Sequence, residues 1–111
     1  MRREIDKAEW GPFLNGVSRF FSDPATQSSK GSLFVVRRAV SSAIMIGVTY
    51  DPKDNEVDIA FEPIDHLVQK PVRIFAEETS DGLRALEVVD AEGIRHVLVP
   101  GVPLPVPDEA G

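Results

Sequence analysis

Apolar residues at every second position dominate the middle of the chain, and this alternation limits what the chain can fold into. It is clearest at Val57, Ile59 and Phe61, which alternate with charged or small residues. Side chains of a β-strand point to opposite faces in turn, so the alternation places one face of a sheet in the core and the other in water. The same pattern recurs over residues 44–50 and 71–79. The sequence therefore predicts a sheet with one buried face.

Six strands follow from this pattern, separated by short loops. Their expected ranges are 33–40, 43–50, 56–62, 71–79, 83–89 and 94–99. Residues 51–55, 80–82 and 91–93 carry the proline, aspartate, asparagine or glycine typical of hairpin turns. Ser41-Ser42 is expected to form a tight link, and residues 63–70 a single turn. Short loops make consecutive strands pair as an antiparallel meander, and about six twisted strands curl toward a roll or small barrel.

An amphipathic helix is predicted before the strands. Asp6 and Glu9 have the spacing of a capping box, and Pro24 ends the helix because proline cannot continue it. Pro12 conflicts with a helix that runs straight from Asp6, so residues 7–10 are expected to form a short turn that bends into it. The apolar stripe consists of Trp10, Phe13, Leu14, Val17, Phe20 and Phe21. Such a stripe needs a cover, and the sheet supplies it.

These elements predict one α+β domain over residues 1–99, with the N-terminal helix on the antiparallel meander. A chain of 111 residues is the size of a single compact domain. Residues 100–111 contain four prolines and two acidic residues, which favour an extended or disordered tail.

Composition excludes several classes of partner and chemistry. The net charge of −6 argues against nucleic acid and anionic lipid as partners, because both need a basic surface. The absence of cysteine excludes disulfides, thiolate metal sites and thiol nucleophiles. No apolar run approaches the roughly 20 residues of a membrane span. The first residues are charged and lack the apolar segment of a secretory signal, so a cytoplasmic location is expected.

The two histidines are the main candidates for chemistry, and neither sits in a recognised motif. His66 follows Asp65, but neighbouring side chains usually diverge, so adjacency does not orient the imidazole. His96 shares the parity of Ile94 and Leu98, which favours a hydrogen-bonded core histidine. The chain has no His-x-x-x-His spacing, nucleophile elbow or phosphate-binding glycine loop. No metal, cofactor or catalytic residue is predicted.

Short segments in both halves of the chain resemble the bacterial family of unknown function DUF5335. They are REIDKAEW at 3–10, PFL at 12–14, VSR at 17–19, HLV at 66–68, PVRI at 71–74, SDG at 80–82 and LEV at 86–88. In that family a His-Leu-Thr-His-like stretch precedes the later strand, whereas Gln69 stands here at the second histidine position. This departure weakens a metal reading. The resemblance implies a self-contained bacterial cytoplasmic domain and no particular activity.

Several strands are apolar on both faces, and this feature guides the leading functional hypothesis. Phe75 faces away from Ile74, and Val97 and Val99 face away from the side expected to be buried. The second face needs a cover from the helix or from a partner. We therefore expect a non-enzymatic domain that acts through protein–protein binding or self-association, with a homodimer as one form.

Two other hypotheses stay open. A small-molecule-binding barrel would place Trp10, Tyr50, His66 and Arg73 around its mouth, since ligand sites combine aromatic walls with a few polar groups. An enzyme would use Asp65, His66 and Arg73, and this is the least favoured reading.

Overall fold

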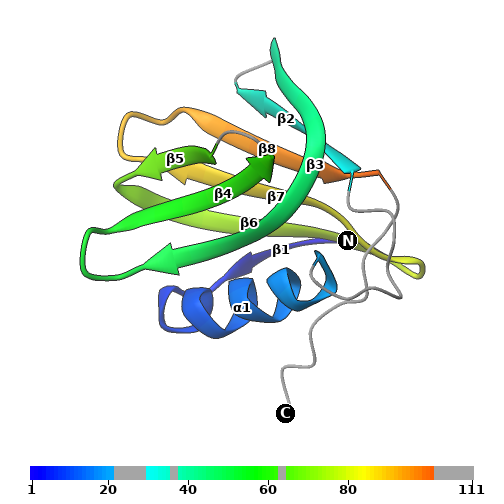
Figure 1. The fold of residues 1–111 in the computed structure, drawn as a ribbon. Coiled ribbons are helices and arrows are strands. Elements are labelled where there is room, and N and C mark those ends of the chain that lie inside the picture. Colours follow the sequence, from blue (N-terminus) through cyan, green and yellow to red (C-terminus); the bar gives the residue numbers. More distant parts are fainter. Residues whose placement is uncertain (22–29, 36–37, 63–64, 102–111) are drawn as a thin grey trace.

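The computed structural model describes residues 1–21, 30–35, 38–62 and 65–101, and within them the chain forms one helix and one eight-stranded antiparallel sheet (Figure 1). The elements are β1 (Arg2–Ile5), a 3-10 turn η1 (Lys7–Glu9), α1 (Trp10–Phe21), β2 (Lys30–Val35), β3 (Arg38–Asp51), β4 (Glu56–Glu62), β5 (Asp65–Gln69), β6 (Pro71–Thr79), β7 (Gly82–Asp90) and β8 (Arg95–Pro100). The predicted α+β class and the antiparallel pairing are confirmed.

Two meanders make up the sheet. The strand order is β1-β6-β7-β8-β2-β3-β4-β5, so β2 to β5 form one run of neighbours and β6 to β8 form another. The runs join where β2 pairs with β8, for example at Leu33 opposite Leu98. β1 adds to the far edge of β6, with Ile5 opposite Ile74. Short loops explain each meander, whereas the two remaining pairings join segments distant in sequence.

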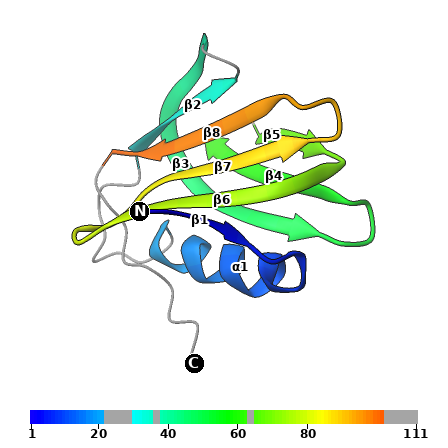
Figure 2. The same cartoon turned by 180° about the vertical axis from the view of Figure 1, so that it is seen from behind.

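The sheet curls into an open roll around the core (Figures 1 and 2). Its edge strands, β1 and β5, do not pair with each other, so the barrel is not closed. The helix α1 lies beside β1 and β3 along the open side, and its main contact with the sheet is with β3. The curl also brings β5 into contact with β7, although four strands separate the two in the sheet order.

The core lies between α1 and the concave face of the sheet. Its helical members are Trp10, Phe13, Leu14 and Val17, which were expected on the apolar stripe. Gly47 lets α1 approach β3 closely, because a Cβ at this position would lie 3.1 Å from the Ser18 hydroxyl oxygen. That hydroxyl accepts a hydrogen bond from the Val48 amide at 2.7 Å and donates one to the Val48 carbonyl. The described residues contain no helix that combines the length and the apolar character needed to cross a bilayer.

The start of the helix agrees with the prediction in shape and differs in its capping. Residues 7–9 form the expected short turn, and α1 begins at Trp10. The capping box is wrong, because the Asp6 side chain makes no capping hydrogen bond. The Asp6 carbonyl instead accepts from the Glu9 amide at 2.8 Å and closes the 3-10 turn. The stop expected at Asp23 and Pro24 lies outside the described residues.

The structure has eight strands where about six were predicted. β1 was not predicted, and β5 replaces the single turn expected over residues 63–70. Ser41-Ser42 is not a link but lies within β3, opposite Leu33 and Ser32. The hairpin turns at 51–55, 80–82 and 91–93 are confirmed. Pro100 ends β8, and residues 102–111 of the predicted tail lie outside the described residues.

Candidate functional site

An open cleft of about 490 Å³ lies on the convex face of the sheet and is called the outer cleft below. It is formed by β1, β6, β7, β8 and the turn between β7 and β8. Its charged lining residues are Arg2, Arg73, Glu87, Asp90 and Arg95. Its apolar lining comes mainly from Val72, Phe75 and Val89. The outer cleft therefore combines an apolar surface with several guanidinium groups, which is a common composition for a binding site.

Glu87 organises the outer cleft from its centre. It lies opposite Phe75 on β6 and Val97 on β8, and only 8% of its surface is exposed. Its carboxylate contacts Nη2 of Arg2 at 2.6 Å and Nε of Arg95 at 3.4 Å. A buried carboxylate needs such partners, because desolvation otherwise disfavours its charge. Glu87 thus holds two guanidinium groups over the sheet.

Phe75 and Arg73 complete the outer cleft on β6. The guanidinium carbon of Arg2 lies 4.1 Å from the centre of the Phe75 ring, which is a cation–π contact. Arg73 is exposed, and no ion pair or hydrogen bond joins its side chain to another of the described residues. Glu87 pairs with Arg2 and Arg95, so Arg73 remains available to pair with an anion from outside the chain. The outer cleft therefore offers a free positive charge on a chain whose net charge is −6.

Asp90, His96 and His66 form a second polar feature, called the histidine chain below. Nε2 of His96 lies 3.0 Å from Oδ2 of Asp90, and Nδ1 of His96 lies 2.9 Å from Nε2 of His66. The three residues come from β7, β8 and β5, and the curl of the sheet brings β5 to this point. Asp90 is itself fixed, because its Oδ1 accepts from the amides of Glu92 at 2.9 Å and Ile94 at 3.0 Å.

The surroundings set the charge states in the histidine chain. Burial, and then the charge of His96, lower the pKa of His66 below its ordinary value. Burial raises the pKa of Asp90, but hydrogen bonds from His96 and from the amides of Ile94 and Glu92 outweigh it and lower that pKa overall. At neutral pH His66 is neutral and Asp90 is ionised. An ionised Asp90 accepts from Nε2–H of His96, which leaves Nδ1 of His96 to accept from His66.

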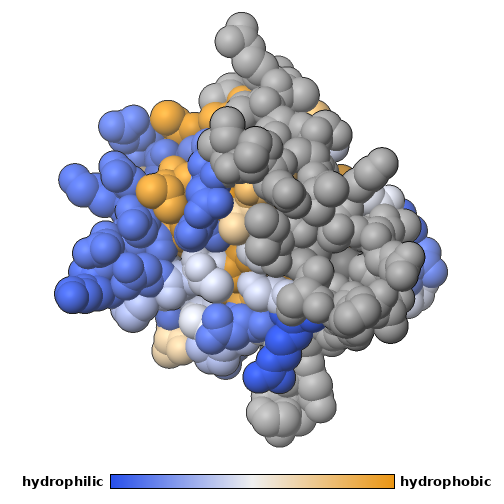
Figure 3. Space-filling view, in the orientation of Figure 1, coloured by the Kyte–Doolittle hydropathy of each residue, from blue (hydrophilic) through white to orange (hydrophobic). Residues whose placement is uncertain are grey.

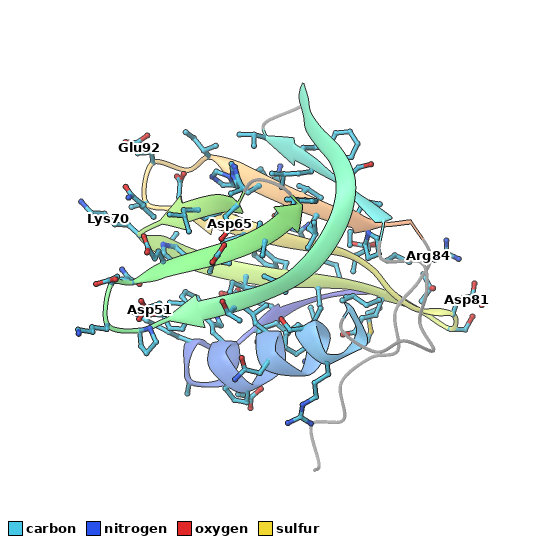
Figure 4. All side chains as sticks on the ribbon, viewed as in Figure 1. Asp51, Asp65, Lys70, Asp81, Arg84 and Glu92 are labelled. Carbon is cyan, nitrogen blue, oxygen red and sulfur yellow. The ribbon has the colours of Figure 1, made fainter. Side chains whose placement is uncertain are left out.

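A smaller cleft of about 310 Å³ borders the histidine chain at His96. Its other polar lining residues are Gln69, Lys70, Asp90 and Glu92. Lys70 and Glu92 project at the same end of the molecule in Figure 4, where the β5–β6 corner and the β7–β8 turn lie. Lys70 adopts a left-handed backbone (φ 53°), and its amide donates to the Asn55 carbonyl at 2.9 Å. This one-residue corner ends β5 beside the histidine chain.

The four residues expected around a barrel mouth do not gather at one place. Trp10 is 1% exposed, its indole N–H donates to the Ile5 carbonyl at 2.9 Å, and its ring meets Tyr50 edge to face at 5.2 Å. The Tyr50 hydroxyl donates to Oδ1 of Asn55 at 3.1 Å. These two residues belong to the packing between α1 and β3. His66 lies in the histidine chain, and Arg73 lines the outer cleft.

Asp65, His66 and Arg73 do not assemble into a catalytic group. His66 bonds to His96, while Asp65 is exposed on β5 and interacts with Asp58 on β4. Burial first, and then the charge and hydrogen bond of Asp65, raise the pKa of Asp58. Neighbouring residues on a strand point to opposite faces, which explains why Asp65 and His66 separate.

Sequence reasoning missed Arg2, Glu87, Asp90 and Arg95. A signal existed for Glu87, because a charged residue stands in the apolar run of 85–89. Its partner Arg2 could not be found, because the pairing of β1 with β6 joins distant segments. The expectation that His96 is a hydrogen-bonded core histidine is confirmed, since it is 7% exposed and bonded at both ring nitrogens.

Comparisons with known proteins agree with the resemblance seen in the sequence. The chain matches "Family of unknown function (DUF5335)" over residues 1–109. It is also 33% identical over 112 residues to an uncharacterized protein of the bacterium Aquifex aeolicus (strain VF5), with 93% of this chain and 96% of that protein covered. No solved structure matches it significantly. The chain therefore belongs to the family of unknown function DUF5335.

Proposed function

We propose that this domain acts by binding a protein partner at the outer cleft, and that the partner presents a carboxylate beside an apolar side chain. The observation that carries the proposal is Glu87, which is 8% exposed and holds Arg2 and Arg95 in place over an apolar surface. Guanidinium groups that are already oriented lose little freedom on binding, and this favours recognition of a carboxylate.

Charge supports an acidic partner. Arg73 is exposed at the rim of the outer cleft and is joined to no other described side chain. An incoming carboxylate there replaces water around one cation without competing against an internal ion pair. Arginine also binds carboxylates through two parallel hydrogen bonds, which gives geometric selectivity.

Apolar surface supports a protein partner rather than a bare ion. Val72 is 52% exposed beside Arg73 and is one of three large hydrophobic residues exposed in the described part of the chain. Phe75 and Val89 continue this surface within the outer cleft and are only partly buried. An apolar centre with arginine at its edge is the usual composition of a protein-binding surface.

The proposal is tested by isothermal titration calorimetry of the full chain at low salt. The probe is a capped peptide of alternating glutamate and leucine. We expect saturable one-to-one binding that weakens as sodium chloride screens the charges. Arg73→Gln is expected to weaken binding about tenfold, because it removes a charged hydrogen bond.

Arg84→Gln is the matched control. Arg84 is exposed on β7, pairs with Asp81 at 2.8 Å, and lies at the opposite end of the molecule from Lys70 and Glu92 (Figure 4). The affinity of the Arg84→Gln variant for the peptide is expected to equal that of the unaltered chain. An equal loss in the Arg73 and Arg84 variants contradicts a specific site, because it indicates general attraction to positive charge.

Two further measurements separate the other candidate occupants. Benzoate binding as tightly as the peptide overturns the proposal in favour of a small-molecule site, and replacement of glutamate by glutamine in the peptide is expected to abolish binding. Light scattering across a range of chain concentrations reports self-association. A dimer that Arg73→Gln dissociates overturns the proposal in favour of a second copy as the occupant.

A further inference from the structure

Two imidazole nitrogens face each other across the inside of the roll. Nε2 of His66 on β5 and Nδ1 of His96 on β8 are 2.9 Å apart, and their rings meet at 48° with centres 5.1 Å apart. β5 and β8 are not neighbours in the sheet, so only the curl of the sheet brings these nitrogens together. The chain has just these two histidines, and the fold places their ring nitrogens within hydrogen-bond distance.

His96 has the hydrogen-bonded carboxylate partner that typically orients a metal-binding histidine. The far nitrogen of His96, Nε2, lies 3.0 Å from the Asp90 carboxylate, and two backbone amides fix that carboxylate. A carboxylate that accepts from one ring nitrogen sets the tautomer and presents the lone pair of the other. For His96 the nitrogen presented in this way is Nδ1, which points at His66.

The distance between the two nitrogens suits a shared ion after a small adjustment. Ligand distances of 2.0–2.1 Å around a tetrahedral ion separate two nitrogens by roughly 3.3 Å. The pair must therefore open by about 0.4 Å, which a half-buried His66 on an edge strand permits. Water is expected to fill the remaining coordination positions, and His96 lines the small cleft, which opens to solvent.

We propose that Nε2 of His66 and Nδ1 of His96 together bind one divalent transition-metal ion of the zinc, nickel or copper class. Imidazole is a ligand for this class, whereas magnesium and calcium require oxygen ligands. Binding moves the proton of His66 from Nε2 to Nδ1 and leaves the proton of His96 on Nε2, hydrogen bonded to Asp90. The site joins β5 to β8 and is independent of the partner proposed for the outer cleft.

Long-range ¹H–¹⁵N spectra of the two imidazoles test the site directly, because only two sets of signals are present. Addition of one equivalent of Zn²⁺ to the full chain is expected to shift Nε2 of His66 and Nδ1 of His96 to metal-bound positions. The signal of Nε2 of His96 is expected to remain that of a protonated nitrogen. Unchanged imidazole spectra with a tenfold excess of Zn²⁺ overturn the proposal.

Calorimetric titrations of variants with Zn²⁺ then show which residues the zinc affinity depends on. His66→Gln is expected to abolish the one-to-one binding, and Asp90→Asn to weaken it about tenfold or more by releasing His96. The thermal midpoint of each variant without metal shows whether it is folded. The spectra of the unaltered chain decide the question if a variant does not fold.

Asp54→Asn controls for the other place where a cation could bind. Asp51, Asp54 and Glu56 form an exposed group at the β3–β4 hairpin whose nearest oxygens lie within 4.8 Å of one another. Asp51 already accepts from the amides of Lys53 and Asp54 there. Zinc affinity is expected to survive Asp54→Asn unchanged. Affinity lost in this variant and kept in His66→Gln overturns the histidine site.

Discussion

Glu87 and Asp58 both place a carboxylate on the convex face of the sheet, but the charged residues around them have opposite signs. Glu87 lies among Arg2 and Arg95, and its carboxylate contacts both. Asp58 lies near Asp65 and Glu56, and its buried Oδ1 has no hydrogen-bond partner among the described residues. One carboxylate orders cations into a cleft, while the other is held at an electrostatic cost. A carboxylate therefore pairs with cations in one region and is disfavoured by burial and like charge in the other.

The β4–β5 region also differs from the outer cleft in its surface. Leu67 on β5 is 48% exposed, and hydrophobic surface appears among hydrophilic atoms on the side where β4 and β5 lie (Figure 3). The charged groups that act on Asp58 in this region, Asp65 and Glu56, are both acidic. The outer cleft is the proposed partner site because apolar surface and the exposed guanidinium of Arg73 coincide there.

Glu87→Gln is expected to have the largest effect on stability. It removes the carboxylate that both Arg2 and Arg95 contact, so the free energy of unfolding should fall by about 2 kcal/mol. Urea denaturation measures the change, with Glu4→Gln, an exposed site on β1, as the control. A loss as small as that of the control would show that Glu87 does not organise the outer cleft.

The ion pair between Arg2 and Glu87 is expected to contribute an intermediate amount to the free energy of unfolding. A double-mutant cycle with Arg2→Gln and Glu87→Gln should give a coupling energy of about 1 kcal/mol, because Glu87 is buried and Arg2 is partly exposed. The coupling should fall in 0.5 M salt by less than that of an exposed pair such as Arg84 and Asp81. Additive effects of the two substitutions would contradict a specific ion pair.

Asp58→Asn should do the opposite of Glu87→Gln and stabilise the protein at pH 7. Burial and the charge of Asp65 disfavour the ionised form of Asp58, so a neutral side chain is expected to raise the free energy of unfolding by about 0.5 kcal/mol. Asp6→Asn is the control, since the Asp6 side chain caps nothing. Destabilisation at pH 7 by Asp58→Asn would contradict the assignment of strain to this region.

The stabilisation by Asp58→Asn should depend on pH in one direction. The pKa of Asp58 is raised in the folded state, so the folded chain binds more protons between the ordinary value of 3.8 and the raised value. Stability from this carboxyl is present below that window and is lost as the pH rises through it. The difference between Asp58→Asn and the unaltered chain should therefore shrink as the pH falls through this window and vanish below pH 3.8. A constant difference from pH 3.5 to 7 would contradict it.

Asp65→Asn is expected to give the smallest change in stability, and it tests whether the charge of Asp65 contributes to the raised pKa of Asp58. Removal of the nearby charge should lower the pKa of Asp58 toward its ordinary value, and carbon-detected NMR titration of the carboxyl measures the change. Stability at pH 7 should rise by less than in Asp58→Asn, since burial is the larger cause of the raised pKa. No change in that pKa would show that Asp65 does not reach Asp58.

The alternation of apolar residues allowed much of the fold to be predicted, because local periodicity reports directly on which side chains are buried. The sheet follows from this alternation, the helix from its apolar stripe, and the three hairpin turns from their proline, aspartate, asparagine or glycine residues. The alternation could not reveal β1, since Arg2–Ile5 has only one buried residue and pairs with a strand about 70 residues away. It also missed β5, since Asp65–Gln69 is short and follows a proline.

The candidate site was harder to predict than the fold, because its parts meet only through long-range pairing. Arg73 was singled out from the sequence, but its companions Arg2, Glu87 and Arg95 come from three other strands. His66 was also singled out, but its partner was not predicted. Its contact with His96 depends on the curl of the whole sheet, which no local pattern encodes.

The central claim is that the outer cleft is the binding surface of this domain, and amide chemical shifts during a peptide titration test it most directly. With the glutamate–leucine peptide, we expect the largest shifts at Arg73, Phe75, Glu87 and Arg95, with little change along α1. Shifts that instead gather on β4 and β5, or spread evenly over the surface, would contradict the account.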